Sequence, residues 1–141
     1  LDVWLGGIAP SELRRVGRLA DGWLPSFVTP DDAARGRETI EQTLASCRRT
    51  IDDDHYGALI PYSTVPVPDA VLAGLAKRRP DVTDVGELVP QGWEALMALI
   101  ERFVRVGTTK FVILPIVEPG SPDAWVEHLE EAAPIVLAAQ T

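Results

Sequence analysis

Apolar runs alternate with amphipathic segments along the chain. The short apolar runs predict strands, and segments with apolar residues at spacings near 3.6 predict helices. We expect strands over about residues 2–6, 22–27, 56–63 and 110–114. We expect helices over about residues 11–19, 30–49, 69–79 and 90–106, and a last one from Ser121. This alternation indicates an α/β fold with a parallel sheet.

The predicted helices also show which residues they bury. The clearest, over about residues 90–106, carries an apolar stripe typical of core packing, made of Trp93, Leu96, Met97, Ile100, Phe103 and Val104. The helix over 30–49 is expected to bury Ala33, Gly36, Ile40, Leu44 and Cys47. The last helix is expected to turn inward Trp125, Leu129, Ala132, Ala133 and Val136.

The segment from residue 64 to residue 90 is the least regular part of the chain. Pro66 and Pro68 interrupt it, a short helix over 69–79 follows, and the rest indicates a loop. Nothing else in the composition marks a boundary. We therefore interpret residues 1–141 as a single domain, with 64–90 as an irregular insertion or loop within it.

Residues 2–27 carry the most information about function. An apolar run ends in Gly6-Gly7, and an amphipathic segment and a second apolar run follow, which predicts a strand–helix–strand unit. Paired glycines at the end of a strand let a ligand approach the backbone closely, and the N–H groups of the following helix favour an anion such as phosphate. Many turns contain such a pair for steric reasons only, so both interpretations stay open here.

Composition and charge exclude several classes of partner. The chain has 141 residues, 46% of them hydrophobic, and a net charge of −8. This charge offers no electrostatic footprint for nucleic acid or an anionic membrane. No apolar stretch approaches the roughly 20 residues that span a bilayer, and no signal peptide is visible. Cys47 is the single cysteine, which favours a buried structural thiol and a reducing cytoplasm.

Candidate catalytic groups are few. The acidic run with a histidine at 52–55 is interpreted as a solvated loop, because three adjacent carboxylates cannot all face one ion, and we assign no metal. His55 precedes its strand, and His128 is expected on or near the outer face of the last helix, so neither makes a credible general base. Asp21 opens its strand at the amino end, which favours a structural turn. The catalytic residues are therefore unknown.

Two stretches carry a resemblance to a known family. Residues 3–25 read V-W-L-G-G-x-x-P-x-x-L-R-R-x-x-R-L-A-D-G-W-L-P, which resembles the fifth strand, helix and sixth strand of the luciferase-like monooxygenase superfamily. Residues 107–115 read G-T-T-K-F-V-I-L-P and resemble its eighth strand. The superfamily includes bacterial luciferase, FMN-dependent monooxygenases and oxidoreductases that use the deazaflavin coenzyme F420.

The resemblance implies the C-terminal half of a TIM (β/α)8 barrel, with about four β/α units and parallel strands. It implies an oxidoreductase or monooxygenase with coenzyme F420 or FMN as cofactor and a small molecule as substrate. The backbone at Gly6, Gly7, Ile8 and Ala9 is expected to approach the ring and phosphate of the cofactor, and Ser26 to offer a hydroxyl to the phosphate. The irregular segment would shape the substrate pocket.

Length adds a further expectation. A complete (β/α)8 barrel needs roughly 250 residues, and this chain has 141 and begins at Leu1. We expect part of a longer flavin- or deazaflavin-dependent enzyme that is inactive alone. The alternative is a non-catalytic half-barrel that is stable as a homodimer, because open sheet edges and an apolar inner face invite association. The residues expected on that inner face are Val3, Leu5, Ile60, Val112 and Leu114.

Overall fold

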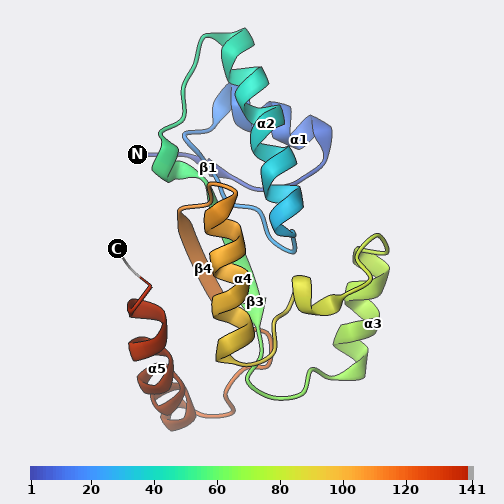
Figure 1. Ribbon diagram of the computed structural model, residues 1–141, viewed down its shortest axis with the longest axis vertical. Helices are drawn as coiled ribbons and strands as arrows, with labels where there is room; N and C mark the ends of the chain where they lie inside the picture. Colours follow the sequence, from blue (N-terminus) through green and yellow to red (C-terminus); the bar gives the residue numbers. More distant parts are fainter. Residues whose placement is uncertain (140–141) are drawn as a thin grey trace.

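The computed structural model describes residues 1–139 (Figure 1). Strands and helices alternate as predicted, with two short 3-10 helices, η1 and η2. The elements in chain order are β1 Trp4–Leu5, α1 Pro10–Leu19, β2 Gly22–Trp23, α2 Pro30–Cys47, η1 Asp53–His55, β3 Gly57–Tyr62, α3 Asp69–Arg78, η2 Val85–Glu87, α4 Trp93–Arg105, β4 Lys110–Pro115 and α5 Pro122–Leu137.

The four strands lie in the order in which they occur along the chain. β1 pairs with β2 and β3 pairs with β4, both in parallel. Parallel bridges from Trp23 to Tyr56 and from Ser26 to Leu59 join β2 to β3. Each strand therefore neighbours the next one in sequence. This is the arrangement of a barrel, whereas a doubly wound sheet reverses its strand order at a switch point.

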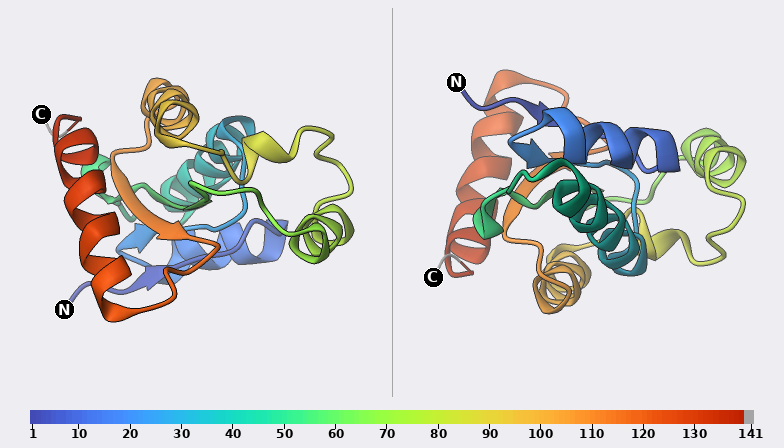
Figure 2. Two further views of the ribbon diagram at one scale, coloured as in Figure 1. Left: turned by 90° about the horizontal axis from the view of Figure 1, so that it is seen from below. Right: turned by 90° about the horizontal axis from the view of Figure 1, so that it is seen from above.

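The helices form an outer layer around these strands. α1 packs on α2, α2 on α4 and α4 on α5, and Figure 2 shows them arranged around the strands, with α3 standing to one side. The sheet therefore has a helix-covered face and an opposite face that these helices do not cover. α3 and η2 belong to the segment predicted to be irregular, which has a small hydrophobic cluster of its own: Val67, Leu75, Leu88 and Val89.

The hydrophobic core lies between the sheet and the helices. α4 places Leu96, Leu99, Ile100 and Phe103 against residues of β3. The stripe predicted on this helix is confirmed for Leu96, Ile100 and Phe103 and is wrong for Val104, whose exposed fraction is 55%. Leu99 is buried instead. The buried residues of α4 lie at positions 96, 99, 100 and 103, a helical face that includes Leu99 and leaves Val104 outside it. A second cluster joins α1 and α2 to β2 through Leu13, Val16, Ala20, Trp23, Ile40, Leu44 and Tyr56.

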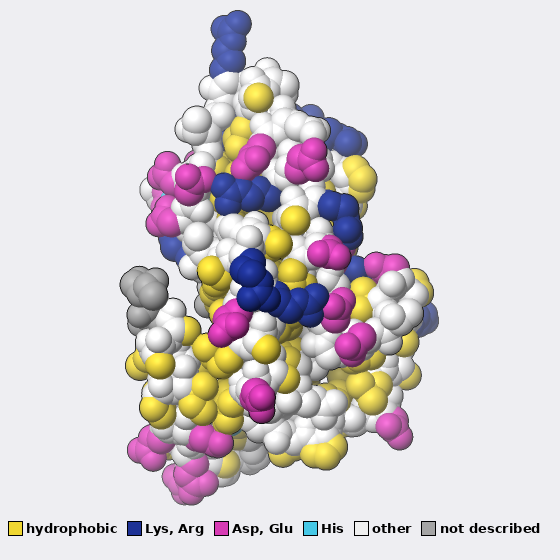
Figure 3. All heavy atoms as spheres, in the orientation of Figure 1, with side chains coloured by type: hydrophobic (Ala, Val, Ile, Leu, Met, Phe, Trp, Pro, Cys, Tyr) yellow, Lys and Arg dark blue, Asp and Glu magenta, His cyan; other side chains and the backbone are white. Residues whose placement is uncertain are grey.

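Several burial predictions are wrong at helix ends and on α5. Cys47 is exposed, because Leu44 is the last buried residue of α2 and Arg48 ends the helix in a left-handed conformation. On α5, Leu129 is 58% exposed and Ala133 is exposed as well. α5 contacts α4 and, through His128, Tyr62 of β3, and Figure 3 shows hydrophobic side chains gathered between α4 and α5.

The uncovered face of the sheet has a different composition from the predicted one. Val112 and Leu114 are 45% and 47% exposed, as expected for that face. Ile60, however, packs in the core beneath α4, and Leu5 packs against the cluster of α1 and α2. Residues alternate between the two faces of a strand, so the inner-face prediction is wrong for Ile60 and Leu5. None of the helices in the described part of the chain is both long and apolar enough to cross a membrane.

Candidate anion-binding site

The turn between β1 and α1 is built around Gly7. Its φ is +94°, a conformation that side chains disfavour. A Cβ atom on Gly7 would lie 2.5 Å from Oε2 of Glu12. Glycine at this position therefore makes room both for the turn and for the carboxylate of Glu12.

Glu12 occupies two backbone N–H groups just before α1, at the N-cap residue Ala9 and at Ile8. Its Oε2 accepts hydrogen bonds from the backbone N–H of Ile8 at 3.1 Å and of Ala9 at 2.9 Å. A carboxylate at this position satisfies free N–H groups and complements the helix dipole. The backbone N–H groups of Ile8 and Ala9, which the resemblance placed near the ring and phosphate of a cofactor, thus already hold an anionic group of the chain itself. A ligand would reach them only after displacing Glu12.

The carbonyl oxygen of Gly7 accepts a hydrogen bond from a buried tryptophan of β2. Trp23 is 1% exposed, and its Nε1 donates a hydrogen bond to the carbonyl oxygen of Gly7 at 3.0 Å. The ring rests against Gly36 of α2, where an added Cβ atom would lie 2.3 Å from Cη2 of the tryptophan. The helix layer therefore fixes the position of the glycine turn.

Ser26 and Phe27 follow β2 at the same edge of the sheet. Ser26 is exposed, and Phe27 has a φ of +54°. A bulky aromatic residue in the left-handed region is an outlier that needs support from its surroundings. The support comes from the C-terminal end of α3. Arg79, the C-cap residue, donates to the carbonyl oxygen of Phe27 at 2.6 Å, and the guanidinium of Arg78 lies 4.6 Å from the centre of the Phe27 ring.

Arg79 is the buried cation of the site. It forms ion pairs with Asp32 at 2.8 Å and with Asp81 at 2.7 Å, and its side chain is 8% exposed. Burial opposes ionisation of Asp32, but hydrogen bonds from Thr29 and Arg79 outweigh it and lower its pKa. The hydrogen bond from Arg79 lowers the pKa of Asp81 to about 2. The charge of Arg79 is thus neutralised within the protein.

These elements enclose a pocket of about 330 Å³ at the carboxyl ends of β1 and β2. Its lining consists of Gly7, Ile8, Glu12, Ser26, Phe27, Arg78 and Arg79. Gly7, Ile8 and Ser26 were predicted from the sequence; Gly6 and Ala9, also predicted, lie beside the pocket without lining it. Glu12, Phe27, Arg78 and Arg79 were missed. For the two arginines the signal was the run of basic residues at 77–79, which a sequence alone does not connect to Phe27, 52 positions before Arg79.

A second group of polar residues lies at the carboxyl end of β3. The hydroxyl of Tyr62 and Nε2 of His128 share a hydrogen bond, and Trp93 Nε1 donates to Glu131 at 2.7 Å. Burial raises the pKa of Tyr62. His128 also lines a pocket of about 300 Å³ with Glu127 and Glu131. The prediction that His128 faces outward is wrong: α5 turns it toward the strand.

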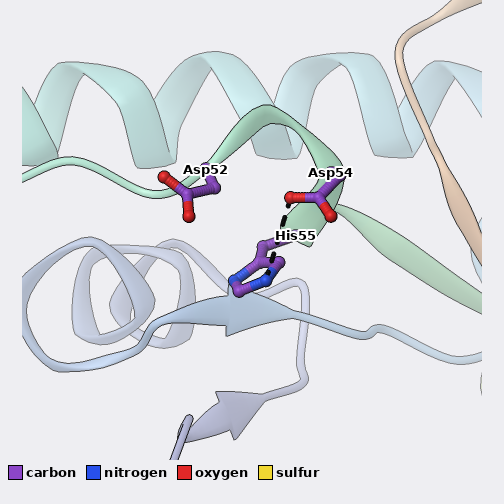
Figure 4. A group of neighbouring side chains, drawn as sticks. All are labelled: Asp52, Asp54 and His55. Atoms are coloured by element: carbon purple, nitrogen blue, oxygen red, sulfur yellow. Dashed lines mark ion pairs between the residues drawn. The ribbon is translucent and has the colours of Figure 1, made fainter.

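The acidic turn before β3 lies at the opposite, amino end of the strands (Figure 4). Ligand atoms of Asp52, Asp54 and His55 lie within 4.8 Å of one another. Asp53 turns away and pairs with Arg37 at 2.7 Å, so the acidic run offers two carboxylates and a histidine to one point, and the absence of a metal here stays a prediction. Nδ1 of His55 donates to the carbonyl oxygen of Asp21 at 2.8 Å. His55 and Asp21 thus link η1 to the start of β2, at the end of the strands opposite to the candidate site.

Comparisons with known proteins identify the fold. No protein-family model matches the chain, and no curated protein matches it. It aligns with the coenzyme F420-dependent tetrahydromethanopterin reductase of Methanopyrus kandleri (TM-score 0.60) and with an F420-dependent secondary alcohol dehydrogenase in complex with an F420–acetone adduct (TM-score 0.64). Each alignment has 18% sequence identity and covers 96% of this chain and 49% of the other.

The chain has the fold of part of a (β/α)8-barrel enzyme. It spans about half the length of the two enzymes that it matches. In such a barrel, ligands bind at the carboxyl ends of the strands. The pocket beside Ser26 lies at that end.

Proposed function

We propose that the chain is the C-terminal part of a luciferase-like oxidoreductase and carries the phosphate-binding side of its cofactor site. The observation that carries this proposal is the pocket at the ends of β1 and β2, where the Ser26 hydroxyl and the Arg78 guanidinium line one cavity. Coenzyme F420 is the cofactor named for both matched enzymes, so we favour it over FMN. A cytoplasmic location stays a prediction from the single cysteine.

The residues of the pocket fit a phosphate in part. Arg78 forms no ion pair within residues 1–139, so its charge is free to hold an anion, and Ser26 supplies a neutral donor. The carboxylate of Glu12 opposes an anion. We therefore assign the phosphate to Ser26 and Arg78, and the N–H groups of Ile8 and Ala9 to the helix cap.

A bound deazaflavin or flavin would supply the hydride chemistry, and this chain would hold the cofactor by its phosphate. The test is a fluorescence titration of the longest natural chain that carries this sequence, with F420 and FMN in parallel. We expect saturable binding of F420. Absence of binding to both cofactors would overturn the proposal, and binding of FMN alone would overturn the choice of F420.

The Glu12→Gln variant should bind phosphate more tightly than the wild type. Glutamine keeps an acceptor for the helix cap and removes the negative charge. A like charge near 4 Å in water is worth about 1 kcal/mol, so we expect an affinity about fivefold higher. Calorimetric titration with inorganic phosphate measures this. Glu94→Gln, in the first turn of α4, is the matched control and should leave the affinity unchanged; equal gains in both variants would mean a bulk charge effect.

A second candidate is a half-barrel that associates with another copy of itself. The observation in its favour is the exposed apolar face of β4, with Val112 and Leu114 about half exposed. Among the described strands β4 pairs with β3 only, so its other edge has free backbone groups. Parallel strands of a second copy would cover this edge and face.

The Leu114→Lys variant separates this candidate from a monomer. If the wild-type chain is a dimer by light scattering, a lysine on the uncovered face should convert it to a monomer at the same concentration. Leu19→Lys is the matched control, because Leu19 on α1 is 64% exposed on the outer layer. A wild-type chain that is monomeric and folded contradicts the dimer.

A further inference from the structure

We propose that Arg79 is a positioning residue that holds Phe27 in its left-handed conformation, so that Ser26 and Arg78 face the same pocket. The inference rests on the proposed function of that pocket as an anion site. It assigns a role to the segment 64–90 as well: Arg78 is the last residue of its helix α3, and Arg79 is the C-cap residue that follows. The anion site would then exist only while α3 is docked on the turn after β2.

The conformation of Phe27 is the first support. Among residues 1–139, Phe27 and Arg48 are the non-glycine residues with positive φ. Arg48 ends a helix, where this conformation is common. Phe27 lies within a connection between a strand and a helix, beside a pocket, where a strained backbone persists only if its surroundings fix it. Strain of this kind concentrates at ligand sites.

The contacts of Arg79 are the second support. Its Nη1 donates to the carbonyl oxygen of Phe27 at 2.6 Å, and its Nη2 donates to Asp32 at 2.8 Å. Nε and Nη2 also donate to Asp81. Asp32 in turn accepts from the backbone N–H of Thr29 at 2.9 Å. One planar guanidinium therefore ties the end of α3 to both ends of the turn that precedes α2.

The placement of Arg78 is the third support. Arg79 points inward and is 7% exposed as a residue, so its neighbour Arg78 is directed to the surface over the Phe27 ring. There it lines the pocket with Ser26. Arg79 cannot itself serve as the anion-binding cation, because two carboxylates already neutralise it. The two adjacent arginines thus have different roles: one positions, the other binds.

Two substitutions separate positioning from general stability. Arg79→Lys keeps a positive charge near Asp32 and Asp81, but an ammonium lacks the fork that reaches several acceptors at once. Arg102→Met is the matched control: Arg102 ties η2 of the same segment to α4 through Glu87 at 2.6 Å, whereas Arg79 donates to the carbonyl oxygen of Phe27. Circular dichroism establishes that each variant is folded.

The experiment combines phosphate titration with amide hydrogen exchange. We expect Arg79→Lys to weaken binding of inorganic phosphate about tenfold, the loss of one charge-assisted hydrogen-bond arrangement. Exchange should accelerate in residues 24–32 and in α3. Arg102→Met should accelerate exchange around η2 and leave the phosphate affinity within about twofold. The inference is overturned if Arg79→Lys binds phosphate like the wild type, if both variants lose affinity equally, or if the wild type binds no phosphate.

A parallel titration with F420 and FMN separates this inference from the proposed function. A wild type that binds phosphate in the manner described but neither cofactor overturns the proposed function and leaves the role of Arg79 standing. A wild type that binds F420, together with an Arg79→Lys variant that binds it equally well, overturns the role of Arg79 and leaves the function standing.

Discussion

The Trp23→Ala variant should lose about 3–5 kcal/mol of its free energy of unfolding. Trp23 is 1% exposed and belongs to the cluster that joins α1 and α2 to the sheet. Its ring fills the space left by Gly36, so no neighbour can replace the lost volume without moving α2. The cost of a large-to-small change is greatest where the site cannot collapse.

Urea unfolding followed by circular dichroism measures this effect. Trp125→Ala on α5 is a suitable comparison, because Trp125 is only half-buried, and we expect a markedly smaller loss there. Equal losses in both variants would contradict the assignment of Trp23 to the buried cluster beneath α1 and α2. Trp23→Phe keeps most of the ring and removes the N–H donor to Gly7. We therefore expect Trp23→Phe to loosen the glycine turn, and to lower the free energy of unfolding less than Trp23→Ala does.

Local chemistry made the order of elements predictable from sequence. Apolar periodicity placed the strands and helices, and Thr29 with Pro30 marked the start of α2, where Thr29 accepts the N–H of Asp32 as an N-cap. The doublet at positions 6 and 7 lies after β1, at the edge of the sheet where the prediction placed it. These features depend on residues only a few positions apart, so the sequence alone is enough to predict them.

Features that depend on distant contacts were missed. Arg79 and Phe27 lie 52 positions apart, and Tyr62 and His128 lie 66 positions apart. No periodicity connects such pairs, because they meet only through the order of the strands. The prediction that Ile60 and Leu5 face the inner side of the sheet is wrong for a related reason. Nearly every residue of a buried parallel strand is apolar, so the sequence does not show which alternate residues face the helices.

The role of Glu12 could have been found locally. It stands three residues after the N-cap residue Ala9, where a carboxylate can accept the N–H of the N-cap residue, as the glutamate of a capping box does. Gly7 alone indicates an anion site at the start of α1. Gly7 together with Glu12 indicates that a carboxylate of the chain itself caps this end of the helix. For this reason the proposed phosphate position is not at the N-terminus of α1 but beside Arg78, at the end of α3.

The charge of Arg78 should decide the affinity of the pocket. Arg78→Glu removes a cation that faces the anion and adds a like charge, so we expect phosphate affinity to fall by about 1.5–3 kcal/mol, roughly ten- to hundredfold. Arg105→Glu is the matched control, because Arg105 is also exposed in the last turn of its helix. It should leave the affinity within about twofold.

Salt dependence makes this prediction sharper. Arg78 is exposed, and interactions of exposed charges are screened over about 3 Å at 1 M ionic strength. The gap between the wild type and Arg78→Glu should therefore narrow as sodium chloride is raised, while the hydroxyl of Ser26 contributes a part that salt does not remove. A Ser26→Ala variant should show the opposite behaviour: a smaller loss that persists at high salt. If Arg78→Glu and Arg105→Glu lose affinity alike, the anion binds elsewhere than beside the Phe27 turn.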